Sequence, residues 1–174
     1  MSKIILFDSP PYMRAWEELV EEGGRKARFT FVETGPAMDV IPLEHDGGNI
    51  FLYLIQEERL PGIYELKAVG GYNRSGENYE ECAIRKLREE VGITAEKEWL
   101  VDLGRMVGFT VIKLPIRFFY TFRWRRDRAV NPRVKLVRMP LDEAVQKVMD
   151  HEFGDESAVL AVLRLYVLET KGQL

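Results

Sequence analysis

The sequence predicts an α/β protein with helices packed on a mixed β-sheet, and three observations support this fold class. Alternating apolar segments bounded by turn residues fill most of the first two-thirds of the chain, as expected for β-strands. One amphipathic segment, residues 77–91, interrupts them with helical periodicity. Two further helical segments follow near the C-terminus, so strands and helices do not alternate as they do in a regular βαβ array.

Each element is predicted from its own pattern and turn residues. Strands are expected at residues 4–7, 27–33, 37–43, 49–56, 63–69, 99–107, 112–124 and 134–139. Helices are expected at residues 77–91, 141–150 and 155–169, the last with Asp155 as its N-cap. A further helix is predicted to open at Ser9-Pro10-Pro11, run to about Glu22 and stop at Gly23-Gly24.

These elements divide the chain into an N-terminal extension, residues 1–25, made of a short strand and a helix, and one domain, residues 26–174. The 174-residue length and 46% hydrophobic content suit a single core. The net charge of −3 gives no general attraction for nucleic acid, and no apolar run approaches the ~20 residues of a membrane helix. A single cysteine fits a reducing compartment, so we expect a cytoplasmic protein with no membrane partner.

The segment GENYEECAIRKLREEVGI, residues 76–93, has an unfavourable charge placement. Glu89 and Glu90 lie in the last helical turn, where the helix dipole costs roughly 0.3–1 kcal/mol per negative charge, and Lys86 lies one turn earlier. Clustered carboxylates beside a glycine-rich loop are suitable ligands for a hard divalent cation, although a solvated acidic face with a salt bridge is an alternative. The core-facing stripe is expected to be Ala83, Ile84, Leu87 and Val91.

Residues 71–93 resemble the Nudix box, G-x5-E-x7-R-E-U-x-E-E-x-G-U, where U is a bulky apolar residue. Eight of the nine specified positions match: Gly71, Glu77, Arg85, Leu87, Glu89, Glu90, Gly92 and Ile93. Residues 30–168 as a whole resemble the ADP-ribose pyrophosphatase branch of the family. The resemblance implies a Nudix α/β/α sandwich, hydrolysis of a nucleoside diphosphate linked to another group such as ADP-ribose or a sugar, an Mg²⁺ or Mn²⁺ cofactor, and a possible homodimer.

The resemblance also assigns roles to individual residues. The catalytic candidates are Arg85, Lys86, Glu89 and Glu90, with Glu89 and Glu90 as metal ligands, and the substrate-binding candidates are Gly70, Gly71, Gly108 and Phe109. Two departures stand out: Lys86 replaces a glutamate of the box, and the loop after Gly108-Phe109 lacks an acid. An ammonium cannot accept a proton or bind a cation, so Lys86 is expected to weaken or abolish the metal site. A base would then come from elsewhere, with Glu152, Asp155 and Glu156 as candidates.

Three functional hypotheses therefore remain open. The first is a hydrolase with an altered site that acts on a small nucleotide-type substrate. The second is a catalytically inactive nucleotide-binding protein on the same fold. The third is an RNA-binding protein that uses FRWRRDR, residues 122–128, although a basic hairpin tip whose aromatic residues pack inward is the favoured interpretation of that segment.

Overall fold

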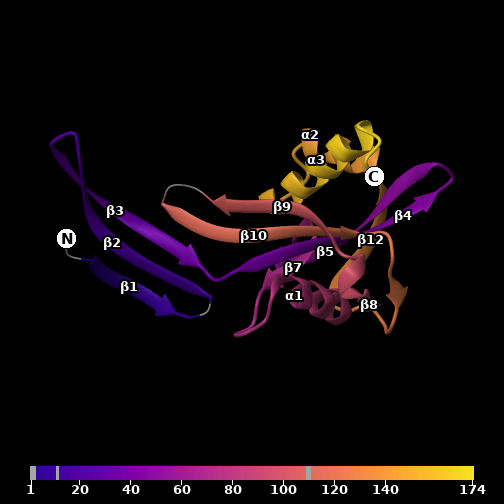
Figure 1. The fold of residues 1–174 in the computed structure, drawn as a ribbon, viewed down its shortest axis with the longest axis horizontal. Coiled ribbons are helices and arrows are strands. Elements are labelled where there is room, and N and C mark those ends of the chain that lie inside the picture. Colours follow the sequence, from indigo (N-terminus) through magenta and orange to yellow (C-terminus); the bar gives the residue numbers. More distant parts are fainter. Residues whose placement is uncertain (1–2, 11, 109–110) are drawn as a thin grey trace.

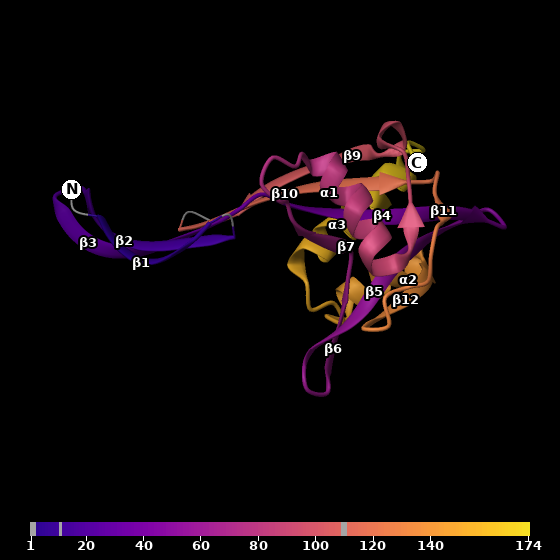
Figure 2. The ribbon, with the colours of Figure 1, turned by 90° about the horizontal axis from the view of Figure 1, so that it is seen from below.

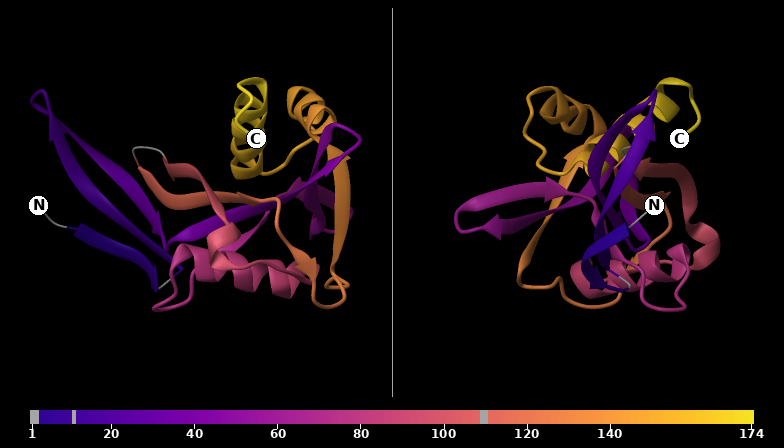
Figure 3. Two further views of the ribbon diagram at one scale, coloured as in Figure 1. Left: turned by 45° about the vertical axis from the view of Figure 1, so that its right-hand side comes forward. Right: turned by 90° about the vertical axis from the view of Figure 1, so that its left-hand side faces the viewer.

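The computed structural model describes residues 3–10, 12–108 and 111–174. A ten-stranded sheet forms its central layer. Helix α1 (Tyr79–Lys86) covers one face, and helices α2 (Leu141–Met149) and α3 (Glu156–Thr170) cover the other (Figure 1 and Figure 3). This α/β/α sandwich confirms the predicted fold class.

The sheet is mixed, because β10 runs parallel to β3 and β4 whereas the other paired strands are antiparallel. The main order is β1-β2-β3-β10-β4-β5-β12, with β6, β7 and β9 paired to β5, β4 and β10. The strands are β1 Lys3–Ser9, β2 Met13–Glu22, β3 Arg25–Thr34, β4 Ala37–Asp46, β5 Asn49–Leu60, β6 Ile63–Lys67, β7 Val69–Tyr72, β9 Val101–Gly108, β10 Ile112–Thr121 and β12 Val134–Pro140. A second, two-stranded sheet pairs β8 (Ile93–Thr94) with β11 (Arg125–Arg126), and a 3-10 turn, Lys97–Trp99, precedes β9.

Two apolar clusters fill the spaces above and below the sheet. Alternate residues of β4 enter them in turn, so that Met38 packs towards α1 and Ile41 towards α2 and α3. On α1 the buried residues include Cys82, which was expected at the helix surface, while Ile84 is only partly buried. The predicted core stripe was therefore rotated by part of a turn. No helix in the described part of the chain is long and apolar enough to cross a membrane.

The predicted N-terminal helix is wrong, because residues 13–22 form strand β2. All ten residues of β2 pair with β3, and Gly23 and Gly24 (φ 58° and 76°) form the two-residue hairpin turn between the strands. The double glycine was interpreted as a helix stop, but long-range pairing with an alternating strand determined the structure instead. Strands β1–β3 form an arm that projects away from the sandwich (Figure 2).

Candidate functional site

The box residues form a loop and a helix whose two ends are both fixed locally. Asn78 caps α1: it accepts a bond from the Glu81 amide (2.9 Å), and the Glu81 side chain accepts one from the Asn78 amide (3.0 Å). After Lys86 the helix widens into a π-helical turn, Leu87–Val91, and ends at Gly92 with φ 65°. A Cβ at Gly92 would lie 2.1 Å from the carbonyl oxygen of Arg128, so only glycine fits there.

Arg85 ties the loop to the outer side of the helix. Its guanidinium donates to both carboxylate oxygens of Glu77 (2.7 and 2.8 Å) and to Glu89 Oε2 (3.0 Å). Arg74 donates to the other oxygen of Glu89 at 3.1 Å. The hydrogen bonds from Arg85 lower the pKa of Glu77 to about 2, against the opposing effect of its burial. Glu89 is thus held by two arginines as part of a structural network.

Lys86 and Glu90 form a separate ion pair on the side of the helix that contacts β7. The Lys86 ammonium lies 2.8 Å from Glu90 Oε1, and only 23% and 15% of the two side chains are exposed. A Cβ at Gly71 would lie 2.5 Å from Lys86 Cε, so the lysine packs directly against the glycine backbone. The second oxygen of Glu90 is buried and has no hydrogen-bond partner among the described residues.

This arrangement does not fit a resident Mg²⁺ or Mn²⁺ ion. Such cations need several oxygen ligands, but Glu89 is held by arginines and Glu90 by an ammonium that would repel the ion. In the described ranges no group of three or more His, Cys, Asp or Glu side chains could hold a metal. Lys86 places a positive charge beside Glu90, one of the two carboxylates that were expected to bind the cation.

A cavity of about 520 Å³ lies beside the glycine pair, between β6, β7, the β9–β10 hairpin and the segment before α3. One wall is apolar and consists of Met106, Ile112, Leu114 and Ile116. The opposite wall is polar and includes Asp39, Lys67 and the segment 154–157. An apolar wall that faces a few polar groups is typical of a small-molecule site.

Asp39 is the third residue of β4 and lies between the fully buried Met38 and Val40. It is 9% exposed, and its Oδ2 atom has no hydrogen-bond partner in the part of the chain that the structure describes. Its other oxygen packs against the paired strand, where a Cβ at Gly70 would lie 1.9 Å from Oδ1. Glycine at position 70 therefore makes room for this carboxyl.

The surroundings of Asp39 keep part of its population protonated near neutral pH. Burial, which penalises the charged form, is the main reason that its pKa rises to about 7. The nearby Ser157 hydroxyl and the charge of Lys67 oppose the shift, whereas the negative charges of Asp155 and Glu90 add to it.

The structure separates the four predicted catalytic residues into two pairs. Lys86 and Glu90 form one ion pair, in which Lys86 packs on Gly71, a residue of the cavity lining. Arg85 and Glu89 lie together on another side of the helix, where they line a shallow groove. The predicted grouping of Glu89 with Glu90 around one ion is not present in this arrangement.

Three of the predicted substrate-binding residues, Gly70, Gly71 and Gly108, line the cavity. Phe109 lies outside the described residues. Among the predicted base candidates, Asp155 and Glu156 also line the cavity, whereas Glu152 pairs with Lys147 at 2.6 Å. Asp155 caps α3 as predicted, accepting bonds from the Ser157 and Ala158 amides.

Sequence reasoning missed three charged residues of the cavity lining: Asp39, Glu65 and Lys67. A signal for Asp39 was present, since it is a single acidic residue inside the apolar strand AMDVIPL. A carboxyl at such a position must be buried at a substantial cost, which often marks a functional group.

The arginine-rich segment 122–128 has its aromatic residues turned inward. Trp124 donates to the Leu43 carbonyl oxygen at 2.9 Å and meets the Tyr53 ring edge-on, and Phe122 stacks on His45 with ring centroids 4.5 Å apart. These contacts occupy the ring faces that a nucleic-acid base would need. The aromatic residues pack inward as expected, but the segment is not a hairpin tip, because β11 pairs with β8 and not with β10.

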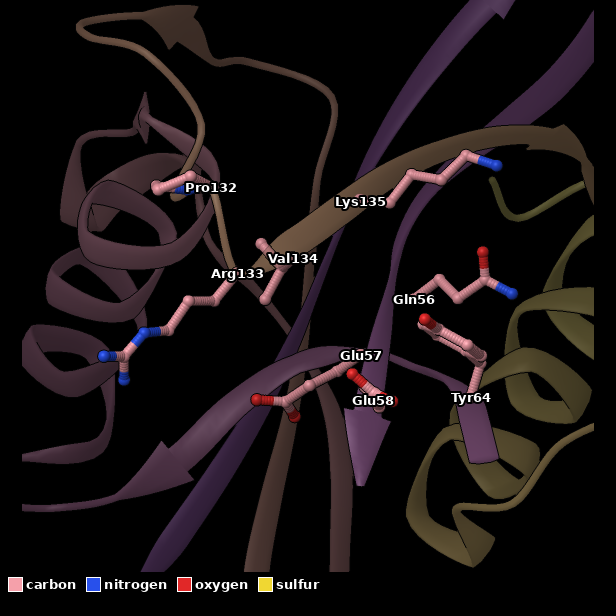
Figure 4. Close-up of a pocket in the computed structure, with 8 residues that line it drawn as sticks. All are labelled: Gln56, Glu57, Glu58, Tyr64, Pro132, Arg133, Val134 and Lys135. Atoms are coloured by element: carbon pink, nitrogen blue, oxygen red, sulfur yellow. The ribbon is translucent and has the colours of Figure 1, made fainter. Parts of the chain in front are cut away.

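A second cavity lies between the β5–β6 hairpin and the start of β12 (Figure 4). Gln56, Tyr64 and Lys135 lie on one side of it, and Arg133 points away from them. Its lining also includes Glu57, Glu58, Pro132 and Val134. Opposite charges are interspersed around it, and it contains no residue of the box.

Comparisons with known proteins agree with this geometry. The family model described as NUDIX domain matches residues 33–161. The crystal structure of an ADP compounds hydrolase has a TM-score of 0.71, with 20% identity over 100% of this chain and 98% of that chain. At this level of identity, the similarity shows a shared fold.

Two proteins are similar in sequence. The methanol dehydrogenase activator of Bacillus methanolicus is 26% identical over 153 residues, 84% of this chain and 80% of that protein. The NAD-capped RNA hydrolase NudC of Mycobacterium tuberculosis is 32% identical over 92 residues, 48% of this chain and 29% of that protein. The second match therefore covers only a part of a longer protein.

Proposed function

Because the chain belongs to the NUDIX domain family, we propose that it hydrolyses a phosphoanhydride bond in a nucleoside diphosphate linked to another group. ADP-ribose and nucleotide sugars are the substrates of this class to test first. Two of the similar proteins are named for ADP compounds and for NAD-capped RNA, and an adenosine diphosphate unit occurs in both kinds of compound.

The observation that carries the proposal is the contact of Lys86 with Gly71, a glycine that lines the cavity. The Lys86 ammonium pairs with Glu90 at 2.8 Å and packs against this glycine. A lysine has three donors, so it can keep its bond to Glu90 and donate another to a phosphate oxygen. The Gly70–Gly71 backbone, which carries no side chain, allows a diphosphate to approach closely.

The two walls of the cavity suit the two ends of such a substrate. The apolar residues of the β9–β10 hairpin can cover a planar base, while the glycine pair and the polar wall face the diphosphate. Positive charge at the phosphate is supplied by Lys86, which stabilises the negative charge that builds up during transfer. The proposal therefore does not require an ion held by the box.

The second candidate is a nucleotide-binding protein without turnover, and the Lys86–Glu90 pair favours it for a specific reason. A carboxylate that is paired with an ammonium, as Glu90 is, is a poor ligand for a cation. In the ordinary box the positions of Lys86 and Glu90 both carry acidic side chains. Binding of the nucleotide would then persist while hydrolysis would be absent.

One experiment separates the candidates. Hydrolysis of ADP-ribose, nucleotide sugars, dinucleoside polyphosphates and nucleoside triphosphates is followed chromatographically, with Mg²⁺, with Mn²⁺ and with EDTA. The natural chain is compared with Lys86→Glu, Lys86→Met and the control Lys135→Met, which removes an ammonium from the cavity of Figure 4.

We expect turnover by the natural chain and the control, a loss of at least tenfold in Lys86→Met, and a stronger metal requirement in Lys86→Glu. No turnover of any compound by the natural chain would reject the hydrolase. Calorimetric binding of the same panel then tests the second candidate. Equal activity of Lys86→Met and the natural chain would reject the role given to Lys86.

We also propose that the chain forms a homodimer through its N-terminal arm. The arm exposes large apolar side chains, including Ile5 (51%), Phe7 (46%) and Phe29 (42%). Among the described residues, Val32 and Glu33 are the only ones of β3 that pair with β10, so the described part of the sandwich covers little of the arm. An exposed apolar sheet of this kind is typical of an interaction surface, and a second copy of the chain would cover it.

A further inference from the structure

The box offers no base for the proposed reaction, yet the cavity contains a buried carboxyl group that it does not use. Glu89 is bound by two arginines and Glu90 by Lys86, so neither is free to take a proton from water. Asp39 is nine-tenths buried and lines the cavity, and its Oδ2 has no hydrogen-bond partner within the described residues. A carboxyl in such a position costs stability and needs a functional explanation.

We propose that Asp39 is the general base that takes a proton from the water attacking the diphosphate. This inference rests on the proposed hydrolase function. The acidic group that the box lacks at Lys86 is thus supplied by strand β4 on the cavity wall, and not by the box helix.

The packing of Gly70 places Asp39 beside the expected phosphate position. A Cβ at Gly70 would lie only 1.9 Å from Asp39 Oδ1, so the carboxyl packs directly on this glycine. The next residue, Gly71, contacts Lys86. The charge of Glu90, which pairs with Lys86, also acts on Asp39, so the ion pair and the Asp39 carboxyl both lie near the glycine pair that a diphosphate would approach. A cation for the phosphate and a base for the water are the two groups that the reaction needs.

The charged groups around Asp39 adjust its proton affinity. Asp155 from the segment before α3 and Glu90 from the box helix raise its pKa, and Lys67 from β6 and the Ser157 hydroxyl lower it. The balance, with burial as the largest effect, is a pKa of about 7. At neutral pH such a group is partly ionised and can accept a proton, and its affinity for the proton is high. An efficient general base needs both properties.

The reaction step is balanced without any additional reagent. The water oxygen bonds to one phosphorus, and the bond from that phosphorus to the bridging oxygen breaks with its electron pair on the oxygen. The water proton moves to Asp39 and later to solvent. The products are two phosphate monoesters.

The other carboxylates on the cavity wall are worse candidates. Asp155 is engaged in capping α3 and accepts the Ser157 hydroxyl at 2.5 Å. Glu65 packs on Gly154, where a Cβ would lie 2.6 Å from Glu65 Cγ. Glu156 is exposed to solvent, unlike the buried Asp39.

The test compares Asp39→Asn, which has almost the same shape, with Glu143→Gln, which removes an exposed carboxylate of α2 outside the cavity. Steady-state kinetics on the best substrate of the natural chain are measured from pH 5 to pH 9. We expect Asp39→Asn to lower kcat by 10²–10⁴-fold with little change in KM, and to abolish the loss of rate below about pH 7. Glu143→Gln should retain both the rate and the pH profile.

The outcomes distinguish the two proposals. If the natural chain hydrolyses a substrate and Asp39→Asn does so at a similar rate, Asp39 is not the base, and the hydrolase proposal is unaffected. If the natural chain hydrolyses nothing, the hydrolase proposal fails and the base fails with it. Should Asp39→Asn not fold, a rate of the natural chain that is flat from pH 5 to pH 8 would refute the inference.

Discussion

Replacing Asp39 with asparagine should stabilise the protein at alkaline pH, and the size of the effect follows from the burial of the carboxyl. Its pKa rises from an ordinary value of 3.8 to about 7 in the folded chain. Between these two values the folded state binds more protons than the unfolded state, so stability is present at low pH and is lost as the pH rises. Asparagine has no proton to lose and removes this dependence.

Between pH 4.5 and pH 8 the ionisation of Asp39 should cost about 3 kcal/mol, because most of a shift of ~3 pH units at 1.36 kcal/mol each falls in this window. Urea unfolding at pH 4.5, 6 and 8 on the natural chain, Asp39→Asn and the control Glu156→Gln measures it. Relative to the natural chain, the free energy of unfolding of Asp39→Asn should rise by this amount between pH 4.5 and pH 8. Other titrating groups contribute equally to both chains and cancel. A difference that does not change with pH, or that moves the other way, would refute the account of Asp39 as a buried acid.

Further predictions concern the box, its cysteine and the arm. Glu77→Gln should cost about 3 kcal/mol of stability at pH 7, because Arg85 lowers the pKa of Glu77 from 4.5 to about 2. This cost should shrink as the pH falls below ~4, and a cost in urea unfolding that does not change with pH would contradict the prediction. Cys82 should not react with a thiol reagent in the folded chain, since burial raises its pKa to about 12, whereas unfolding in urea should expose it; labelling of the folded protein at the rate of a free thiol would disprove this. Light scattering should show a dimer of the natural chain and a monomer of Phe7→Asp, and a monomeric natural chain would reject the proposed interface.

The elements that the sequence predicted correctly are those whose signals are local. The box helix has its own caps in Asn78 and Gly92, and the central strands alternate or are continuously apolar. The arm was mispredicted in β2, where glutamates at helical spacing and the Gly23-Gly24 stop imitate a helix. Its strand structure depends on pairing with β3, which no local pattern in β2 reveals.

The site divides in the same way. Motif spacing located the cavity edge at Gly71 and the pair of Lys86 and Glu90, because residues three and four apart on a helix must be neighbours. Spacing could not show that Glu89 turns towards arginines, since Arg74 comes from the preceding loop. Nor could it select Asp39, whose burial depends on the packing of distant segments against β4.

The two halves of the box now account for the acidic charge at the end of its helix. The helix dipole disfavours Glu89 and Glu90, and each is compensated by a cation: arginines on one side, Lys86 on the other. The half that contains Glu77, Arg85 and Glu89 holds the loop to the helix and needs no metal to do so. The half that faces the cavity is already neutralised before any ligand binds. An acid for chemistry must therefore come from a group that no cation holds, and among the described residues of the cavity wall Asp39 has the buried, unpartnered oxygen that meets this condition.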